Sequence, residues 1–353
     1  MSWLHEVRSS VDARLALFFE TKRAEVKGSA PDALPIFEGL FDLTMRGGKR
    51  LRPAVLVAAQ RAVQPDASID LVIDACAALE VLQSYLLIHD DWMDGDEERR
   101  GGPSVHMILR RGLQTTNHPQ GSAAGAATLD HLGDSLAVLS GDLGSAYANE
   151  LLLGSIVHSK RGIDATRAFM STQCDVVLGQ TLDLLGSHDV TLMQQLKTGS
   201  YTVDGPLVMG ALLANGSDAQ VACLRAYGLP LGEAFQMRDD LLGTFGDTAK
   251  TGKPVGNDLR VGKRTALVRE CELSVPVEKR TALARVFGQP KATDAEVREA
   301  MNLLIETGVR TRVETRLRGL VEEAKSKLDA TLLAPEGIAL LAELAELLGA
   351  RDY

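Results

Sequence analysis

Apolar residues recur along most of the chain at the three- and four-residue spacing of amphipathic helices. Ala and Leu dominate these stretches, and β-branched alternation over more than a few residues is hard to find. The pattern predicts helices over residues 1–27, 54–63, 68–94, 136–153, 164–185, 200–213, 219–242, 295–306 and 311–328. We therefore expect an all-α fold, a single-domain helical bundle of about ten or more helices that spans residues 1–353.

Residues 112–133 interrupt this helical pattern. They are rich in Gly, Ser, Thr and Ala and include the turn-forming sequence Asn117-His118-Pro119. Because strong helical patterns resume directly afterwards, the segment indicates a long loop inserted in one domain and not a linker between two.

The 353 residues carry 38 Lys and Arg against 47 Asp and Glu, which gives a net charge of −9. This balance disfavours a protein that coats nucleic-acid phosphates, and the 45% hydrophobic content excludes a disordered chain. No apolar run reaches the length of a membrane span, and the first residues lack the apolar stretch of a signal peptide. The four cysteines are far apart and form no CxxC pair, so we expect free thiols in a cytoplasmic globular protein.

The most unusual local feature is the acidic run that follows the apolar sequence Tyr85-Leu86-Leu87-Ile88. Asp90, Asp91 and Asp94 form a DDxxD pattern, in which the first and last acids lie about 40° apart on one helix face. Like charges at this spacing repel unless a cation lies beside them, and carboxylate oxygens suit Mg²⁺ that shares phosphate oxygens of a substrate. The alternative is a helix end that frays into an acidic surface.

A second acidic pair, Asp239-Asp240, ends another apolar helical pattern, and Gln236 lies one turn before it. If the two acidic helix ends face each other across a cavity, they could hold a diphosphate through bridging Mg²⁺ ions. Two solvated helix ends remain the alternative at this point.

Several cations lie next to small residues, where the backbone can approach an anion closely. Any one of them alone is typical of a solvated surface, but together in an acidic chain they favour anion pockets. These cations are Lys49, Arg52, Arg99, Arg100, Lys197, Lys253 and Lys263.

Other catalytic patterns are missing from the sequence. It contains no GxSxG elbow, HExxH motif, Walker motif or strand-linked GxGxxG. His89, beside the first acid, is expected to be structural and satisfied by a neighbouring carboxylate or carbonyl.

These motifs, in this order, resemble those of the trans-isoprenyl diphosphate synthases, or polyprenyl synthetases, over about residues 40–270. The second acidic motif departs from the common DDxxD pattern, because Gly243 stands where a third acid often lies. The matching elements are GGKRLRP at 47–53, Gln83, DDxxD at 90–94, Arg99-Arg100-Gly101, GQTLDL at 179–184, KTGSYT at 197–202, FQMRDD at 235–240, FGD at 245–247, TGKP at 251–254 and GKRT at 262–265.

The resemblance implies an all-α bundle around a deep central cavity, usually a homodimer, with about three Mg²⁺ ions in each active site. It implies that Asp90, Asp91 and Asp94 hold metal with Asp239, and that Asp240 assists through water or hydrogen bonds. It further implies that the allylic diphosphate meets Arg99, Lys197 and Lys253, and that isopentenyl diphosphate meets Lys49, Arg52, Gln83 and Arg100. Lys263 is expected to be a further substrate-binding residue, and Thr198 and Gln236 to line the space beside the forming carbocation.

The expected activity is therefore a Mg²⁺-dependent, head-to-tail condensation of isopentenyl diphosphate onto an allylic diphosphate. The alternatives are a terpene cyclase, which would not need the second diphosphate pocket, and a non-catalytic partner subunit, which would be expected to have lost carboxylates. Resemblance places chain-length control at Tyr85 and Leu86 and favours geranylgeranyl diphosphate (C20) over farnesyl diphosphate (C15). The helical wheel puts Leu79 and Leu82 nearer to the Asp90 face than Tyr85 is, so they are alternative floors of the channel.

Overall fold

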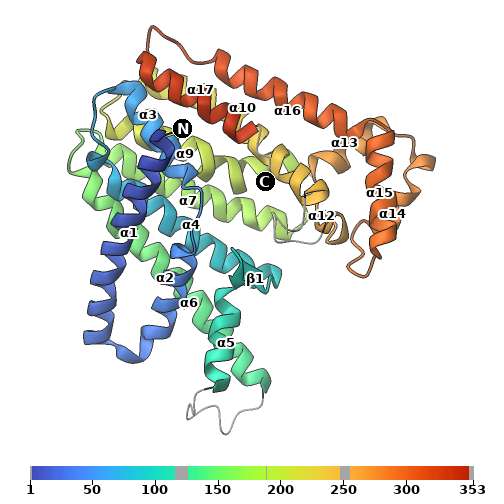
Figure 1. Ribbon diagram of the computed structural model, residues 1–353, viewed down its shortest axis with the longest axis horizontal. Coiled ribbons are helices and arrows are strands. Elements are labelled where there is room, and N and C mark those ends of the chain that lie inside the picture. Colours follow the sequence, from blue (N-terminus) through green and yellow to red (C-terminus); the bar gives the residue numbers. More distant parts are fainter. Residues whose placement is uncertain (1, 116–125, 188, 247–254, 350–353) are drawn as a thin grey trace. The chain divides into compact units, whose positions relative to one another are not determined.

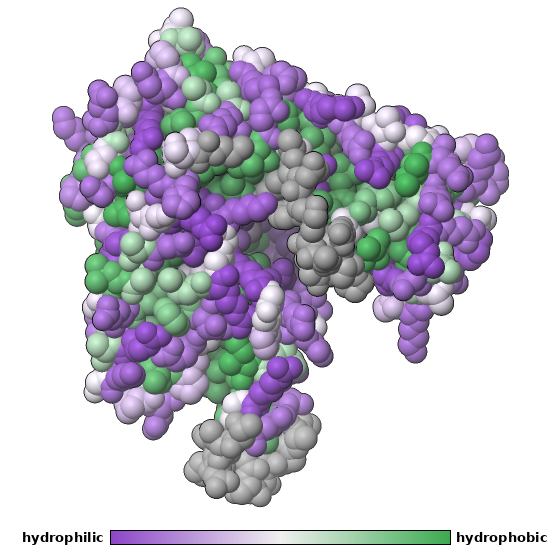
Figure 2. All heavy atoms as spheres, viewed as in Figure 1, coloured by the Kyte–Doolittle hydropathy of each residue, from purple (hydrophilic) through white to green (hydrophobic). Residues whose placement is uncertain are grey.

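The computed structural model describes residues 2–115, 126–187, 189–246 and 255–349. Packing between the elements divides the chain into two units, one of Met1–Val57 with Asp66–Thr166 and one of Ala58–Pro65 with Arg167–Tyr353. Helices dominate both units (Figure 1), which confirms the predicted all-α class. On the face drawn in Figure 2, hydrophilic and hydrophobic side chains are interspersed.

The first unit is built around α4, which packs along α6 and also contacts α1 and α2. Phe19 and Phe37 are fully buried in its core, and edge-to-face contacts join Phe37 to Tyr147 of α6. Its elements are α1 (Ser2–Ser29), η1 (Pro31–Ala33), α2 (Leu34–Met45), α3 (Leu51–Val63), η2 (Ile69–Leu71), α4 (Ile73–Asp94), β1 (Glu98–Arg99), β2 (Gly102–Pro103), α5 (Val105–Thr115), α6 (Ala126–Ile156) and α7 (Gly162–Leu184), of which α3 and α7 continue into the second unit.

A short antiparallel hairpin follows α4 and was not predicted from the sequence. Arg99 pairs with Gly102, so Arg100 and Gly101 form a two-residue turn, and both have positive φ angles of 52° and 73°. This is the geometry of a type I′ hairpin turn, which normally favours Asn-Gly or Gly-Gly. Arg46, at the end of α2, secures the hairpin by donating hydrogen bonds to the carbonyls of Arg99 and Pro103.

The loop predicted over residues 112–133 is shorter than expected, because α5 continues to Thr115 and α6 already begins at Ala126. Arg110 and Asp134 join the two helices through a two-pronged ion pair, with Nε and Nη2 each 2.8 Å from a carboxylate oxygen. A Cβ atom on Gly133 would lie 2.9 Å from the Arg110 Cα atom, so a small residue is needed where the helices meet. The glycine at position 133 therefore reflects close packing of α6 on α5, and Asn117-His118-Pro119 lies outside the described residues.

The second unit surrounds α10, which packs against α9, α16 and α17. Tyr227 of α10 is fully buried and donates a hydrogen bond to the Leu341 carbonyl of α17, which ties the C-terminal helix to the centre. The remaining elements are α8 (Val190–Gln194), η3 (Gln195–Asp204), α9 (Gly205–Leu213), α10 (Asp218–Phe245), α12 (Asn257–Arg260), α13 (Ala266–Ser274), η4 (Val277–Lys279), α14 (Thr281–Val286), α15 (Asp294–Glu306), α16 (Val309–Ser326) and α17 (Pro335–Gly349).

The segment predicted as one helix over residues 200–213 is divided. A π-helix, η3, covers Gln195–Asp204, and the α-helix α9 begins only at Gly205. Two glycines, Gly179 and Gly232, let neighbouring helices approach the π-helix. Cβ atoms at these positions would lie 2.7 Å and 3.3 Å from the Cα atoms of Lys197 and Gly199, respectively. π-Helical turns are rare and frequent at functional sites, so this element marks its surroundings as a candidate site.

The cysteines and the apolar helices can be compared with what the sequence predicted. All four cysteines are free thiols, with Cys174 exposed and the other three buried. Across the described ranges, no helix is both long enough and apolar enough to cross a bilayer.

Candidate functional site

The last turn of α4 carries the DDxxD acids in the first unit. The helix ends at Asp94, and Gly95 follows in the left-handed conformation (φ 68°) that closes many helices. Asp91 is completely buried, Asp90 is half-buried and Asp94 is exposed. The three acids therefore occupy graded positions from the interior to the surface.

Arg99 of the hairpin faces this acidic run. Its Nε atom lies 2.6 Å from Asp91 Oδ1, and its Nη2 atom lies 3.1 Å from Asp96 and 3.8 Å from Asp90. Burial raises the pKa of Asp91 to about 6, against the lowering effect of Arg99, and the charge of Asp90 adds to the rise. The arginine thus neutralises part of a carboxylate cluster that would otherwise repel itself.

The next residue, Arg100, belongs to a group of cations that we call the arginine cluster, which consists of Arg50, Arg52, Arg99 and Arg100. Burial lowers the pKa of Arg100, and its three cationic neighbours lower it further, although Glu80 partly opposes them. A Cβ atom on Gly48 would lie 3.6 Å from Arg50 and 3.8 Å from Arg100, so the glycine gives these guanidinium groups room. Cations held this close are suited to a polyvalent anion that relieves their repulsion.

Arg50 anchors the cluster, although it was not among the residues predicted for the site. Its guanidinium is 2% exposed and reaches Asp12 at 2.8 Å, Glu80 at 2.6 Å and the Thr44 carbonyl at 3.1 Å. Like Arg100, it has a positive φ angle, here 50°. The ion pairs to Asp12 and Glu80 hold Arg50 in a backbone conformation that non-glycine residues rarely adopt.

The remaining residues predicted for the isopentenyl diphosphate pocket also lie in this unit. Lys49 is exposed, Arg52 is buried and Gln83 is half-buried on α4. Arg52 is brought into the arginine cluster, whereas no contact of Gln83 with it is described.

Tyr85 and His89 form an edge-to-face pair on α4, with ring centroids 4.9 Å apart. His89 Nε2 lies 3.0 Å from the Val138 carbonyl of α6, which is the kind of partner expected for this histidine. A Cβ atom on Gly144 of α6 would lie 3.2 Å from Tyr85 Cβ, so the tyrosine packs directly on that helix. Leu86 is half-buried, whereas Leu79 and Leu82 are fully buried in the core of the unit.

In the second unit, Asp240 is the acid most firmly held by protein groups. It is completely buried, and it accepts hydrogen bonds from Gln194, from Gln236 and from the backbone N–H of Ala266, at 3.2, 2.9 and 2.9 Å. Gln236 is buried beside it, whereas Asp239 is half-buried. Three hydrogen bonds therefore hold the Asp240 carboxylate in a fixed position.

Lys263 lies among the acids of this unit, with its Nζ atom 3.8 Å from both Asp240 and Asp258. Burial alone would lower its pKa, but the surrounding carboxylates outweigh burial and raise the pKa. We call this group the lysine–carboxylate cluster; its members are Lys263, Asp183, Asp239, Asp240 and Asp258.

Lys197 extends from the π-helix η3 to α7. Its Nζ atom lies 2.6 Å from the Asp183 carboxylate, and Thr198 follows it in a half-buried position. The GQTLDL motif is thereby explained, because Gly179 admits the π-helix and Asp183 pairs with its lysine.

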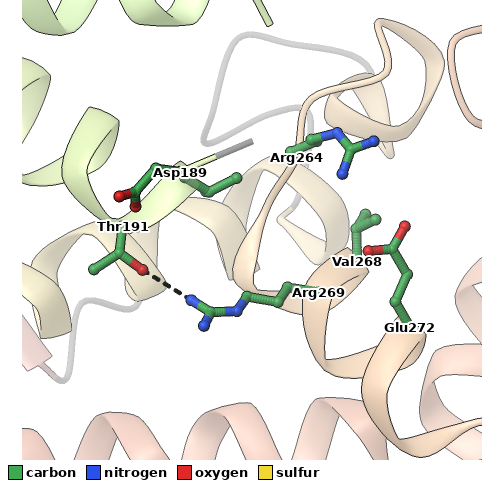
Figure 3. A pocket seen from close by; sticks show the side chains of 7 residues that line it. Asp189, Thr191, Arg264, Val268, Arg269 and Glu272 are labelled. Carbon is green, nitrogen blue, oxygen red and sulfur yellow. Dashed lines mark hydrogen bonds between the residues drawn. The ribbon is translucent and has the colours of Figure 1, made fainter. Parts of the chain in front are cut away.

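A pocket of about 500 Å³ is described elsewhere in the second unit, between the start of α8 and α13. Figure 3 shows Arg269 directed at Thr191, with a hydrogen bond of 2.8 Å, and Arg264 and Glu272 at its margin. None of the residues predicted for catalysis lines it.

Comparison with known proteins places this geometry in a family. The polyprenyl synthetase family model matches residues 35–304. The chain is 31% identical to a short chain isoprenyl diphosphate synthase from Methanocaldococcus jannaschii, over 74% of each chain. It is also 31% identical to a geranylfarnesyl diphosphate synthase from Aeropyrum pernix, over 81% of this chain and 84% of that one.

The chain belongs to the polyprenyl synthetase family, and it is a prenyltransferase. A solved geranylgeranyl pyrophosphate synthase from Corynebacterium glutamicum, complexed with isoprenyl diphosphate and magnesium, has a TM-score of 0.85 to it. The two are 32% identical, and the match covers 99% of both chains.

The residues of this polyprenyl synthetase suit a hard divalent cation. Asp91 Oδ2 is buried and accepts no hydrogen bond from the described residues, and the neighbouring donors are carboxylate oxygens. Within the described ranges, no three acidic, histidine or cysteine side chains converge to hold a metal by themselves. A cation here would complete its shell with water and diphosphate oxygens, which is the usual environment of Mg²⁺.

Sequence reasoning about this polyprenyl synthetase missed three residues that the structure places beside predicted ones: Arg50 in the first unit, and Asp183 and Asp258 in the second. Arg50 could have been suspected from its motif, and Asp183 from its place in GQTLDL. Asp258 carried no signal of its own, because it follows Gly256 and Asn257 in an ordinary helix start. Lys253 and Asp247, which the sequence analysis noted, lie outside the described residues.

Proposed function

We propose that this enzyme condenses isopentenyl diphosphate onto an allylic diphosphate and that its main product is geranylgeranyl diphosphate. The observation that carries the proposal is the arginine cluster next to the DDxxD acids, because it offers a second anion pocket beside a metal-binding carboxylate group. A terpene cyclase, which binds one diphosphate, has no use for that pocket.

In the proposed reaction, the allylic C1–O bond breaks and the diphosphate leaves with the electron pair. The isopentenyl double bond attacks C1 through its C4 atom, and a proton is lost from C2 to the departing diphosphate. Lys197 and Lys263 would stabilise the negative charge that develops on the leaving group, and fixed cations are effective there because they need no reorganisation.

Arg100 and Arg52, with Lys49 and Gln83, would hold the diphosphate of isopentenyl diphosphate and so keep its double bond near the allylic carbon. Holding two reactants in place in this way accounts for much of the rate in such reactions. Thr198 and Gln236 would line the space beside the carbocation. No protein nucleophile is required.

Asp90, Asp91 and Asp94, together with Asp239, would hold about three Mg²⁺ ions in the proposed site, and Asp240 would assist through hydrogen bonds. When bound, the ions neutralise the diphosphate charge and make it a better leaving group.

The C20 product is favoured by the bulk of Tyr85, which is half-buried and braced by His89 and the α6 backbone at Gly144. A braced aromatic side chain is a firmer stop for a growing chain than a mobile one. The structural relative from Corynebacterium glutamicum carries the name geranylgeranyl pyrophosphate synthase, which supports the same length.

We further propose that the enzyme is a cytoplasmic homodimer. Four exposed apolar side chains repeat every seven residues along α7, with exposed fractions from 51% to 63%; they are Ile163, Met170, Val177 and Leu184. A seven-residue apolar repeat lies on one face of a helix, and an identical stripe on a second copy complements it.

The activity is tested by incubating the purified protein with Mg²⁺, labelled isopentenyl diphosphate and, in turn, dimethylallyl, geranyl and farnesyl diphosphate, and then sizing the products. We expect C20 diphosphate from each primer. Cyclic hydrocarbons released from a single allylic substrate would identify a cyclase, and the absence of any product would contradict the proposal.

A further inference from the structure

Asp258 and Gly243 lie together in the second unit although 15 positions separate them in the sequence. Gly243 is on the last turns of α10, and Asp258 is on α12. A Cβ atom on Gly243 would lie 2.5 Å from Asp258 Cγ and closer still to one of its oxygens. The Asp258 carboxylate therefore occupies the space that any side chain at position 243 would need.

Asp258 also holds Lys263 in two ways. Its carboxylate lies 3.8 Å from the Lys263 Nζ atom, and its backbone carbonyl accepts a hydrogen bond of 2.9 Å from the Lys263 N–H. The turn between them therefore fixes both ends of the lysine, with the ammonium placed between Asp258 and Asp240. The same turn continues to Ala266, whose N–H donates to Asp240.

We propose that Asp258, admitted by the bare backbone of Gly243, is a positioning residue that holds Lys263 for the allylic diphosphate. It brings to the end of α10 the carboxylate that position 243 itself lacks. Without it, the ammonium would be left with Asp183, Asp239 and Asp240 as its described carboxylate neighbours and would be drawn to them in place of the substrate. The inference rests on the proposed function, since it assigns Lys263 to the diphosphate of the allylic substrate.

Two substitutions act on this contact from opposite sides. Asp258→Asn keeps the size of the side chain and removes its charge, and Gly243→Ala places a methyl group in the space of the carboxylate. We expect either change to raise the KM for the allylic diphosphate about tenfold and to leave the KM for isopentenyl diphosphate within about twofold. Binding of an unreactive allylic S-thiolodiphosphate with Mg²⁺, followed by calorimetry, should weaken by the same factor.

The two sites should also be coupled. In an Asp258→Ala background the carboxylate is gone, so we expect Gly243→Ala to have no further effect on binding of the thiolodiphosphate. The effect of Gly243→Ala on thiolodiphosphate affinity should therefore differ about tenfold between the two backgrounds. This difference corresponds to a coupling free energy of about 1.4 kcal/mol. Additive effects of the two changes would overturn the proposal.

A matched control separates the contact from the general effect of Ala in a helix. Gly319 lies within α16 and has nothing within 4 Å of its Cβ position, so Gly319→Ala should leave both KM values unchanged. If the two test variants raise the KM values of both substrates equally, Asp258 has a structural role only. The same conclusion would follow if thermal melting showed a smaller folded population while thiolodiphosphate affinity stayed unchanged. A wild-type protein with no prenyl transfer would instead contradict the proposed function, whatever the coupling.

Discussion

At the scale of single residues, the left-handed backbone of Arg100 is the feature that best connects structure with chemistry. An Arg–Gly pair in a type I′ turn costs free energy that Asn–Gly would avoid. The turn directs the guanidinium into a group of buried cations, where burial and like charge lower its pKa. Both the backbone conformation of Arg100 and the charge beside its cationic neighbours cost free energy. An anionic ligand that binds the guanidinium would offset this cost.

We predict that Arg100→Ala weakens isopentenyl diphosphate far more than the allylic substrate. A guanidinium contacts phosphate oxygens in a two-pronged manner, so we expect the KM for isopentenyl diphosphate to rise about 10- to 100-fold. Initial-rate kinetics with each substrate varied in turn gives both KM values. Because Arg99 stays paired with Asp91, the allylic KM should change little. Equal losses for the two substrates would contradict this division between adjacent arginines.

Tyr85→Ala should release longer products than the wild-type enzyme. Removing the ring leaves room beside α4 for another isoprene unit, and it also removes the partner of His89. Product sizing by mass spectrometry should show C25 or longer diphosphates in addition to C20. Leu86→Ala serves as the comparison, since this neighbour was the second residue expected to control length. If Tyr85→Ala stays folded and active with an unchanged product spectrum, Leu86 and Leu82 become the next candidates for the stop.

At the scale of elements, the π-helix η3 is placed by glycines of the helices on either side. Gly179 of α7 and Gly232 of α10 both lie where a side chain would meet the η3 backbone. The Lys197 ammonium therefore contacts the Asp183 carboxylate of α7 directly. The position of a proposed substrate-binding lysine thus depends on the absence of side chains in two other elements.

Gly179→Ala should displace η3 and weaken the Lys197–Asp183 ion pair. The added methyl group would lie 2.7 Å from the Lys197 Cα atom, and overpacking of this kind costs about 1–3 kcal/mol. Urea unfolding followed by circular dichroism should show this loss, together with reduced turnover. Gly112→Ala on α5 is the matched control, because nothing lies within 4 Å of its Cβ position. That change should stabilise the protein by up to about 1 kcal/mol through helix propensity. Unchanged stability of Gly179→Ala would show that η3 yields without cost.

At the scale of the whole molecule, the exposed apolar stripe along α7 is the feature of the described chain on which the proposed dimer is argued. Large apolar side chains exposed by half or more on one helix face are typical of an interface. No run of charged residues interrupts this stripe along α7, whose intervening residues are largely small or polar.

We predict that Met170→Glu combined with Val177→Glu converts a dimer to monomers. Two buried charges on each copy, repeated across the twofold axis, would cost far more than the interface could offset. Sedimentation velocity at micromolar concentration distinguishes the two states. Leu273→Glu on α13 introduces the same kind of change at a side chain that is 75% exposed, and it should leave the dimer intact. A wild-type protein that sediments as a monomer would contradict the assembly itself.

The sequence alone determined the helical class, the positions of the longest helices, and the residue types of the chemistry, whereas shorter helices such as α2, α5 and α13 were not predicted. The predicted features depend on local spacing: the three- and four-residue apolar periods, the DDxxD acids one turn apart, and the cations next to glycines. The helices predicted at 219–242 and 295–306 match α10 and α15 closely for this reason. The roles of individual site residues in catalysis, and the single-domain organisation, remain predictions.

Only the tertiary structure decided which groups meet. The hairpin, the π-helix and the early start of α6 arise from contacts with other elements, such as Arg46 on the hairpin and Arg110 on Asp134, and no local pattern encodes them. In the same way, the sequence showed that Gly243 lacks a carboxylate, but only the fold brings Asp258 into its space. Periodicity reports how one segment presents its side chains, whereas the identity of the neighbour depends on how distant segments pack.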